Sequence, residues 1–184
     1  MISWKKKRSV RTRYDSTADI YDRRYHEEQE AKYRSALADV DLGGSFLDVG
    51  CGTGLFFKHV SAKATNVVGI DVSKALLRRA KEMAKVSGNI DLVQADADSL
   101  PFKDRDFDAI FAFTVLQNMP VPLVTLREIR RTAKSGATVV VTGLKKVFSV
   151  HTLRKLVEDA ELRVVFIIKD EKLACNILRA QREQ

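Results

Sequence analysis

The stretch Ser45-Phe-Leu-Asp-Val-Gly-Cys-Gly-Thr-Gly54 restricts the possible folds of this chain more than any other segment. Its first half, with Phe46, Leu47 and Val49, is a short apolar run of the kind that forms a buried strand. Glycines then occupy alternate positions, and apolar residues at roughly helical spacing follow them. We therefore expect a strand, a tight glycine turn and a helix. Such a turn brings a ligand close to the backbone and directs the free N–H groups of the helix start toward it.

The spacing of the glycines narrows this interpretation. The dinucleotide-binding fingerprint is G-x-G-x-x-G, whereas this chain has G-x-G-x-G preceded by Asp48 within the strand. The pattern resembles the first motif of the class I methyltransferases that use S-adenosylmethionine (SAM), an acid followed by G-x-G-x-G. The resemblance implies that this segment binds the cofactor, through Asp48, Gly50, Cys51, Gly52 and Gly54. An ordinary glycine-rich connection between a strand and a helix is the alternative.

Length and composition indicate one soluble globular domain. The chain has 184 residues, of which 45% are apolar and 30% are charged. No apolar run approaches the ~18 residues of a membrane span, and the basic start is not followed by the apolar segment of a secretory signal. Cys51 and Cys175 have no metal-type spacing, so no metal site is expected. We expect a cytoplasmic protein without membrane contact.

The excess positive charge is concentrated at the N-terminus. The net charge is +8, but residues 1–13 contain six basic residues and no acid, which leaves 26 basic and 24 acidic residues elsewhere. We therefore expect a basic N-terminal arm over 1–13 and a single methyltransferase domain over 14–184. With Trp4 available to stack on a base, such an arm can follow an RNA backbone. A solvated, disordered tail is the alternative.

Residues 14–43 are expected to form helices that precede the first strand. The spacing of Tyr14 and Tyr21, each followed by an acid, resembles the N-terminal lid of the ubiquinone-biosynthesis-like, type-11 methyltransferases. The resemblance implies that both tyrosines lie near the cofactor. Packing of the helix on the sheet is the alternative role for either ring.

The second expected strand, 67–71, ends in an acid 21 residues after Gly50. A carboxylate at the carboxyl end of a strand in this kind of fold can accept both hydroxyls of a ribose. Asp71, with Val72 beside it, is therefore a candidate for the ribose of SAM. Capping of the next helix is an alternative role for Asp71, although Ser73 is better placed for it.

Another acid follows the third expected strand, 90–94. The loop Ala95-Asp-Ala-Asp-Ser-Leu-Pro-Phe102 resembles the adenine site of methyltransferases, in which a carboxylate precedes small residues and Leu-Pro-Phe. The resemblance implies that Asp96 accepts the adenine amino group and that the Ala97 N–H faces the ring. Asp98 is the alternative acid, and we favour Asp96 because it comes first after the strand.

The fourth expected strand, 107–113, is strongly apolar and hence central. In the methyltransferase fold the residues after this strand face the methyl donor. The resemblance therefore implies that Phe113 contacts the cofactor and that Gln117 and Asn118 are candidate acceptor-side residues. Neither amide is a strong base, and a polar helix start explains the pair equally well. The Asn/Asp-Pro-Pro-aromatic motif of enzymes that methylate base amines is absent, as is the Pro-Cys nucleophile.

Alternating strands and helices predict a three-layer, doubly wound α/β fold. We expect a mostly parallel seven-stranded sheet with an antiparallel C-terminal strand, preceded by N-terminal helices, as in class I, Rossmann-like methyltransferases. The resemblance covers about residues 44–179. Lys145 and Lys146 follow the fifth expected strand, 138–142, at the ligand edge of such a sheet, and are candidates for a substrate phosphate.

The expected function is transfer of a methyl group from SAM to a nitrogen or oxygen of RNA, either tRNA or rRNA, with S-adenosylhomocysteine (SAH) as product. The basic arm, Trp4 and the lysine pair Lys145 and Lys146 favour RNA. The lid-like helices favour the alternative, a small-molecule acceptor of metabolite or quinone type. A third alternative is a SAM-binding subunit without catalysis. Resemblance to small tRNA and rRNA methyltransferases also makes a small activator protein a candidate partner.

Overall fold

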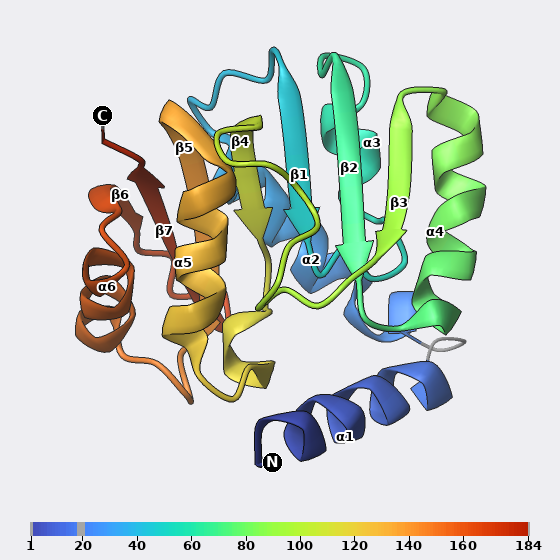
Figure 1. Cartoon of the computed structure of the whole chain (residues 1–184), viewed down its shortest axis with the longest axis horizontal. Coiled ribbons are helices and arrows are strands. Elements are labelled where there is room, and N and C mark those ends of the chain that lie inside the picture. The colour runs from blue at the N-terminus through green and yellow to red at the C-terminus, as the bar shows by residue number, and fades with distance from the viewer. Residues whose placement is uncertain (1, 18–20, 184) are drawn as a thin grey trace.

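Seven strands form a central sheet in the computed structural model (Figure 1). The structure describes residues 2–17 and 21–183. At residues 2, 3, 17 and 21–25 it describes the backbone but not the side chains. In chain order the strands are β1 (Ser45–Val49), β2 (Asn66–Asp71), β3 (Ile90–Gln94), β4 (Phe107–Ala112), β5 (Ala133–Leu144), β6 (Arg163–Ile168) and β7 (Cys175–Gln181). Their order across the sheet is β3-β2-β1-β4-β5-β7-β6. The strands from β3 to β5 pair in parallel, and β7 pairs antiparallel with β5 and β6. The expected mostly parallel sheet with an antiparallel C-terminal strand is confirmed.

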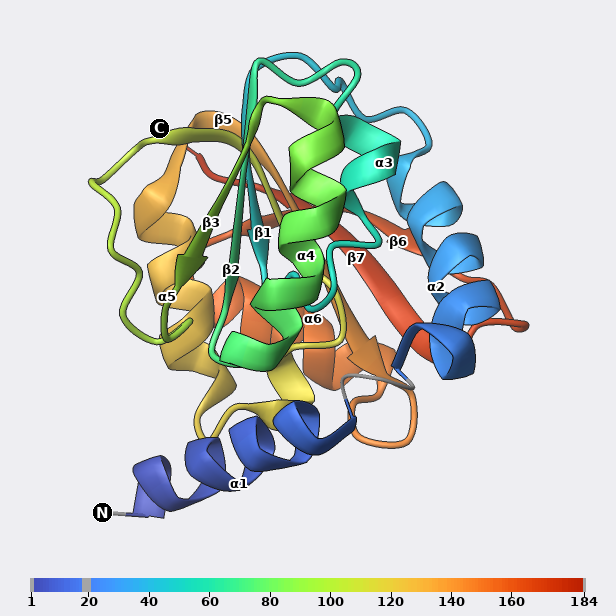
Figure 2. The ribbon, with the colours of Figure 1, turned by 90° about the vertical axis from the view of Figure 1, so that its right-hand side faces the viewer.

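Helices cover both faces of the sheet and make the three layers. Figures 1 and 2 show α5 (Pro122–Thr132) and α6 (Val150–Asp159) on one face, and α2 (Tyr21–Leu37), α3 (Phe57–Val60) and α4 (Lys74–Ser87) on the other. Strand β1 is buried between the layers because its apolar side chains alternate in direction. Leu47 and Val49 belong to the apolar cluster that contains Leu126 of α5, whereas Phe46 belongs to the cluster that contains Ala80 of α4.

The N-terminal segment differs from the expected division into an arm over 1–13 and a lid that begins at residue 14. Helix α1 runs from Ile2 to Thr17 without a break at that boundary. A chain segment this basic has little apolar surface with which to stabilise a helix by packing. Contacts with distant residues supply the missing support: Lys6 Nζ donates to the Met119 carbonyl at 2.7 Å, and Ser73 Oγ donates to Asp15 Oδ1 at 2.5 Å. Both ends of α1 are thus tied to loops of the domain.

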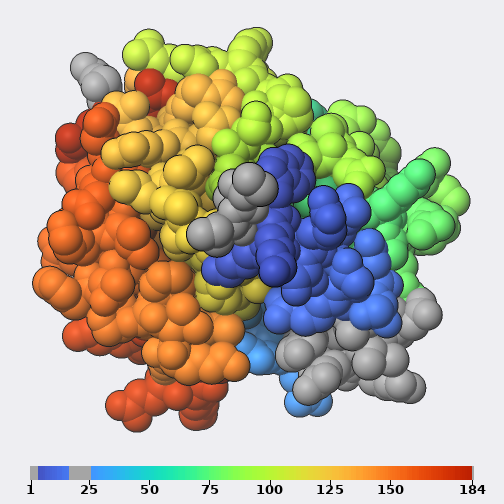
Figure 3. Space-filling view, turned by 60° about the horizontal axis from the view of Figure 1, so that its bottom comes forward, coloured from blue at the N-terminus to red at the C-terminus, as the bar shows by residue number. Residues whose placement is uncertain are grey.

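Helix α1 lies along the edge of the sheet at which the parallel strands end. In Figure 1 the arrowheads of β1, β2 and β4 point toward it. Figure 3 looks more directly at this edge, where α1 (blue) crosses the middle of the molecule next to the start of α5 (yellow). The short 3₁₀ helix η1 (Leu116–Asn118) precedes α5 and packs near α1. The ligand edge of the sheet is therefore covered by the chain's own N-terminal helix.

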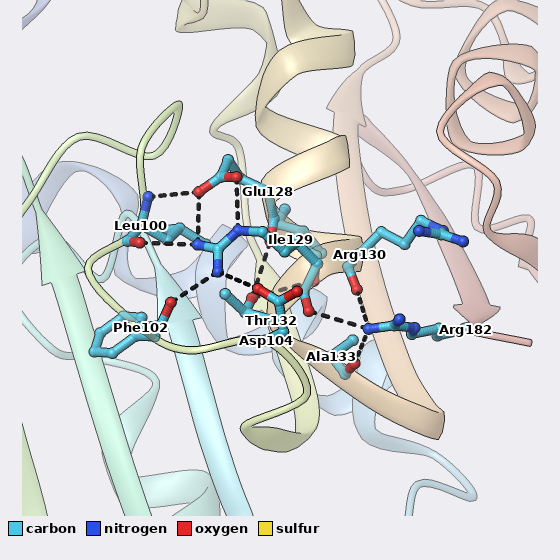
Figure 4. A network of polar contacts seen from close by, with 10 residues as sticks. Leu100, Phe102, Asp104, Glu128, Ile129, Arg130, Thr132, Ala133 and Arg182 are labelled. Carbon is cyan, nitrogen blue, oxygen red and sulfur yellow. Dashed lines mark hydrogen bonds and ion pairs between the residues drawn. The ribbon is translucent and has the colours of Figure 1, made fainter. Parts of the chain in front are cut away.

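A polar network anchors the loop that connects β3 to β4 (Figure 4). The guanidinium of Arg131 on α5 donates to the carbonyls of Leu100 and Phe102 at 2.9 and 2.8 Å and to Asp104 Oδ1 at 2.8 Å. Glu128 accepts from Arg131 at 2.8 and 2.9 Å and from the Leu100 N–H at 2.8 Å. The Arg131 hydrogen bonds hold the pKa of the Glu128 carboxyl below its usual range. Two side chains of α5 thereby fix a long loop that has little regular structure.

Replacing this anchor should destabilise the domain. Arg131→Met removes the donors of five hydrogen bonds and leaves the two loop carbonyls without a partner. We expect the free energy of unfolding to fall by about 1–2 kcal/mol in urea denaturation, since the pair is only partly buried. Arg127→Met, at an exposed position of the same helix, is the matched control and should change stability by less than about 0.5 kcal/mol. Equal stability of both variants would contradict an anchoring role.

Candidate cofactor-binding site

A pocket with about 710 Å³ of empty space, part of which is open solvent, lies between α1 and the carboxyl ends of β1, β2, β3 and β4. Nine residues expected at the cofactor or acceptor line it: Tyr14, Gly50, Gly52, Asp71, Val72, Asp96, Ala97, Phe113 and Asn118. Eight further residues complete the lining without having been expected there: Lys7, Val10, Ile70, Leu76, Ala95, Thr114, Val115 and Met119. Most of the latter flank expected residues in sequence, whereas Lys7 and Val10 come from α1.

The glycine turn provides an open cradle next to the sheet. Gly52 has a φ of +58°, and a Cβ placed on it would meet no protein atom within 4 Å, so its backbone faces open space in the pocket. Gly54 serves packing instead: its Cβ would lie 2.6 Å from the ring of Phe57 at the start of α3. A side chain is disfavoured at Gly52 because it would enter the ligand space. At Gly54 it is disfavoured because it would displace α3.

Asp71 holds the turn in place from the neighbouring strand. Its Oδ2 accepts from the Gly52 N–H at 3.0 Å and its Oδ1 accepts from the Ser73 N–H at 2.8 Å. Burial nevertheless raises the pKa of the Asp71 carboxyl above its ordinary value. Ser73, as expected, is the residue that caps α4, because its Oγ accepts from the Leu76 N–H at 3.1 Å. Asp71 is thus free of the capping role and lines the pocket beside the turn.

Asp48 is the second buried carboxyl of this region. It is 2% exposed, and burial together with the nearby Asp71 raises its pKa from 3.8 to about 8. Asp48 does not itself line the pocket, but it lies directly below the glycine turn on β1. Two acids in an interior that disfavours negative charge make this part of the pocket suited to a cationic ligand. SAM, which carries a sulfonium and an amino group, fits this arrangement.

At the other end of the pocket, Lys7 of α1 holds the acid expected to bind adenine. Its Nζ donates to both carboxylate oxygens of Asp96 at 2.9 and 2.7 Å and lies 2.5 Å from Asp98 Oδ2. Burial alone would lower the pKa of Lys7, but the bonds to the two acids raise it above its ordinary value. Both candidate acids therefore meet one lysine, and of the two Asp96 lines the pocket. Asp98, which does not line the pocket, also accepts from Thr125 Oγ1 on α5.

Asn118 connects the acceptor side of the pocket to α1. Its Oδ1 accepts from Arg13 at 3.0 Å, and its Nδ2 donates to the Tyr14 hydroxyl at 3.1 Å and to the Thr114 carbonyl at 3.2 Å. Gln117 does not line the pocket and donates to the Thr114 carbonyl. The expected pair is therefore divided, with Asn118 in the pocket and Gln117 behind it.

Several expected site residues do not line the pocket. Cys51 is buried behind the glycine turn, and burial raises the pKa of its thiol, which makes it a packing residue rather than a nucleophile. Lys145 and Lys146 are exposed after β5, and Lys145 donates to the Asp170 carbonyl at 2.8 Å. These lysines lie in the turn after β5, at the expected edge of the sheet, but neither of them lines the pocket. The side chain of Tyr21 lies outside the described residues.

The glycine cradle gives the most direct test of the site. In Gly52→Ala the new methyl group would enter the ligand space, and we expect SAM affinity in calorimetry to fall roughly tenfold or more, about 1.4 kcal/mol or more. Gly88→Ala is the matched control, because Gly88 caps α4 with a φ of +75° and also has no atom within 4 Å of an added Cβ. Both variants should lose about 1–2 kcal/mol of stability from the strained backbone. Equal SAM affinity in both would remove Gly52 from the site.

The buried Asp48 predicts a pH dependence of SAM binding. Because its pKa is about 8 in the free protein, the carboxyl is mostly protonated at pH 6 and mostly charged above pH 8. A bound cation favours the charged form of Asp48, so the pKa of this carboxyl falls in the complex. SAM affinity should therefore rise between pH 6 and 8, by at most about tenfold per pH unit. Asp48→Asn should lose this contribution. Titration calorimetry of both proteins measures it, and identical pH profiles would contradict the assignment.

Similarity to known proteins agrees with this geometry. A family model described as "Methyltransferase domain" matches residues 47–141. A demethylmenaquinone methyltransferase of Staphylococcus haemolyticus is 35% identical over 145 residues, which are 73% of this chain and 60% of that protein. Its counterpart from Staphylococcus carnosus is 31% identical over 135 residues, 72% of this chain and 56% of that protein. The chain thus spans less than two thirds of the length of these curated relatives.

Solved structures share the fold at lower sequence identity. A chain in the complex between the Haloferax volcanii Trm112 methyltransferase activator and a methyltransferase superimposes with a TM-score of 0.81, 18% identity and coverage of 93% of this chain and 98% of that chain. A SAM-dependent methyltransferase from Aquifex aeolicus has a TM-score of 0.76, 23% identity and coverage of 91% and 98%. This chain has the class I fold, and by the match over residues 47–141 it belongs to the methyltransferase domain family.

Proposed function

We propose that this protein is a SAM-dependent methyltransferase whose acceptor is a small ring-bearing molecule of the quinol type. The observation that carries the proposal is the position of α1. Lys7, Val10 and Tyr14 of this helix line the same pocket as the glycine turn and Asp71. The acceptor must therefore fit beneath a helix of the chain itself, which suits a small molecule better than a nucleotide within a folded RNA.

The wall of the pocket near the end of β4 suits a flat apolar ring. Val10 of α1 lines the pocket together with Phe113, Val115 and Met119, and Tyr14 adds an aromatic ring. Asn118, held by Arg13 and Tyr14, supplies a polar group at the border of this apolar wall. A few polar groups in a mainly apolar pocket are typical of sites for small organic ligands.

The curated relatives support the same class of acceptor. Several are named demethylmenaquinone methyltransferases, although this chain spans 56–60% of their length. An electrophilic methyl group requires an electron-rich partner, and a quinone ring is electron-rich only in its reduced, hydroquinone form. The acceptor that we propose for this chain is therefore the hydroquinone rather than the quinone.

The chain's own contribution to the reaction is alignment and exclusion of water. SAM, when bound, supplies a methyl group already activated on a sulfonium. The glycine turn with the buried Asp48 would hold the cationic part of the cofactor. Asp71 would accept the ribose hydroxyls, and Asp96 would hold the adenine amino group in place of Lys7. Helix α1 and the apolar wall exclude water and orient the acceptor. None of these roles requires a dedicated general base.

Methyl transfer from labelled SAM to two acceptors in parallel tests the proposal. One acceptor is demethylmenaquinone with a short side chain, reduced with dithionite, and the other is total RNA. We expect label in the hydroquinone and none in RNA, with loss of transfer in Gly52→Ala but not in Gly88→Ala. Label in RNA alone would overturn the proposed acceptor. Label in neither would favour a non-catalytic SAM-binding subunit or a requirement for an activator protein.

RNA remains the second candidate because of the outer surface of α1. Lys5, Arg8 and Arg11 are exposed on it, and Trp4 is 64% exposed. This surface fits a phosphate backbone with an adjacent base for stacking. Steep weakening of RNA binding with added salt, lost in a Lys5→Gln, Arg8→Gln, Arg11→Gln variant, would favour this candidate. Deletion of the whole segment is unsuitable as a test, because Lys7 and Val10 line the pocket.

A further inference from the structure

A buried lysine lies behind the pocket wall and outside the residues that the cofactor requires. Lys32 of α2 is 1% exposed, and its Nζ donates to Thr114 Oγ1 at 2.9 Å and to Gln29 Oε1 at 3.3 Å. The carboxylate of Glu28, one turn earlier on the helix, is 3.7 Å away. A lysine is seldom buried so completely unless its ammonium has partners. The Thr114 hydroxyl is one of those partners, and Thr114 itself lines the pocket.

The Thr114 hydroxyl has a donor left over for a ligand. A hydroxyl can accept from two groups and donate its single proton to one. Its oxygen accepts from Lys32, so its proton must point away from the ammonium. Among the atoms that the structure describes, no hydrogen bond from this hydroxyl is found, and Thr114 lines the pocket. A molecule in the pocket is therefore the group to which this hydroxyl can donate.

The backbone of Thr114 is held in a conformation that its side chain disfavours. Its φ is +61°, in the left-handed region that β-branched residues rarely adopt. The Thr114 N–H donates to Thr142 Oγ1 on β5 at 2.7 Å, and its carbonyl accepts from Asn118 at 3.2 Å. Such strain persists where the surroundings impose it, and it is concentrated at functional sites. Lys32, Thr142 and Asn118 together fix the direction of the hydroxyl.

We propose that the Thr114 hydroxyl donates a hydrogen bond to an oxygen of the methyl acceptor, and that the buried ammonium of Lys32 behind it favours the ionised form of that oxygen. The acceptor class is then a hydroxyl-bearing ring or enol that reacts as its anion. Thr114 is a catalytic residue in this assignment because it touches the acceptor, whereas Lys32 is a positioning residue that acts through it. The assignment rests on the proposed small-molecule function and makes it more specific.

The anionic oxygen explains how a weakly acidic ring becomes a nucleophile. An electron pair of the acceptor forms the new bond to the methyl carbon, while the carbon–sulfur bond breaks and its pair stays on sulfur, which gives SAH. If a ring carbon is methylated, the ring proton on that carbon then leaves to water, and the oxygen regains its negative charge. If the oxygen itself is methylated, its proton has left before the step. Both routes need the anion and no further reactant.

Other charged groups near Lys32 and the pocket define the controls. Glu28 of α2 is the closest acid to Lys32, and Cys175 of β7 faces it with a thiol whose pKa is raised, mainly by burial. The positive charge of Lys145, which follows β5, acts against burial and favours a lower pKa of that thiol. Toward the pocket lie the acids Asp48, Asp71 and Asp96, with Lys7 paired to the last. A Lys32 variant keeps all of these charged groups. A change in the pKa of a bound acceptor between the variant and the unmodified protein is therefore due to Lys32.

A coloured acceptor analogue tests the assignment without catalysis. We would bind 4-nitro-1-naphthol in the presence of SAH, so that no methyl transfer occurs, and follow its anion by visible absorbance during a pH titration. The pKa of the bound naphthol should be about one pH unit below that of the free compound, because a nearby cation favours the anion. Lys32→Met and Thr114→Val should abolish this shift. Thr114→Ser, which keeps the hydroxyl, and Lys85→Met, which removes an exposed lysine of α4, should retain it.

Kinetics with the reduced short-chain demethylmenaquinone at saturating SAM give the second readout. Thr114→Val should lower kcat/KM for the acceptor roughly 10- to 100-fold while SAM affinity changes less than about twofold. Lys32→Met should move the rising limb of the pH profile to higher pH, since the acceptor loses the charge that favours its anion. A merely structural role for Lys32 would lower activity at all pH values without moving the limb.

The outcomes separate the two proposals. If the original protein neither methylates the hydroquinone nor binds the naphthol, the proposed function and this assignment both fail. If it binds the naphthol but does not methylate the hydroquinone, the proposed function fails. If it methylates the hydroquinone, and Thr114→Val and Lys32→Met behave like Lys85→Met, the proposed function stands and the assignment is wrong. Should Lys32→Met fail to fold, the comparison of Thr114→Val with Thr114→Ser decides the question alone.

Discussion

Parallel pairing of β2, β1 and β4 is the constraint on which the site depends, because it makes three strands end at one edge of the sheet. Every side chain that follows these strands is brought to the same place by the register of the backbone. The register pairs Val49 with Ile70 and Asp71 with Gln94, so the glycine turn, Asp71 and the loop with Asp96 start side by side. Residues far apart in sequence then need only short loops to line a common pocket.

Two buried carboxyls at that edge determine the character of the pocket. Asp48 and Asp71 lie in an interior that raises the pKa of both, which is unfavourable for the free protein and favourable for binding a cation. The opposite end of the pocket is already neutralised by the ion pair of Lys7 with Asp96. Adenine can use Asp96 only if Lys7 gives up part of this contact, and Asp98 remains as its second partner. Cofactor binding and the position of α1 are therefore linked by one lysine.

The sequence, through its short-range patterns and the resemblance to class I methyltransferases, was sufficient to predict the mostly parallel seven-stranded sheet and most of the pocket. Apolar runs, three glycines and an acid at each strand end locate the edge, and nine expected residues line the pocket.

Helix α1 was not foreseen as a helix over 2–17, because its composition is that of a charged tail and its stability comes from tertiary contacts. Lys32 was missed for a related reason: nothing local distinguishes a lysine whose partner, Thr114, is 82 residues away. Lys145 and Lys146 were expected at the ligand edge since they follow a strand, but that strand is β5, one beyond β4, and neither lysine lines the pocket.

The central claim is that the cofactor binds under α1 at the edge of the sheet. Hydrogen exchange of the backbone amides with and without SAH tests it most directly, since exchange reports local opening of each segment. The account predicts slower exchange both in the glycine turn, 50–54, and in α1 between residues 4 and 15. Less slowing is expected in Gly52→Ala at the same, non-saturating SAH concentration. Slower exchange in the turn with no change in α1 would contradict the claim, because the helix would then not close over the bound cofactor.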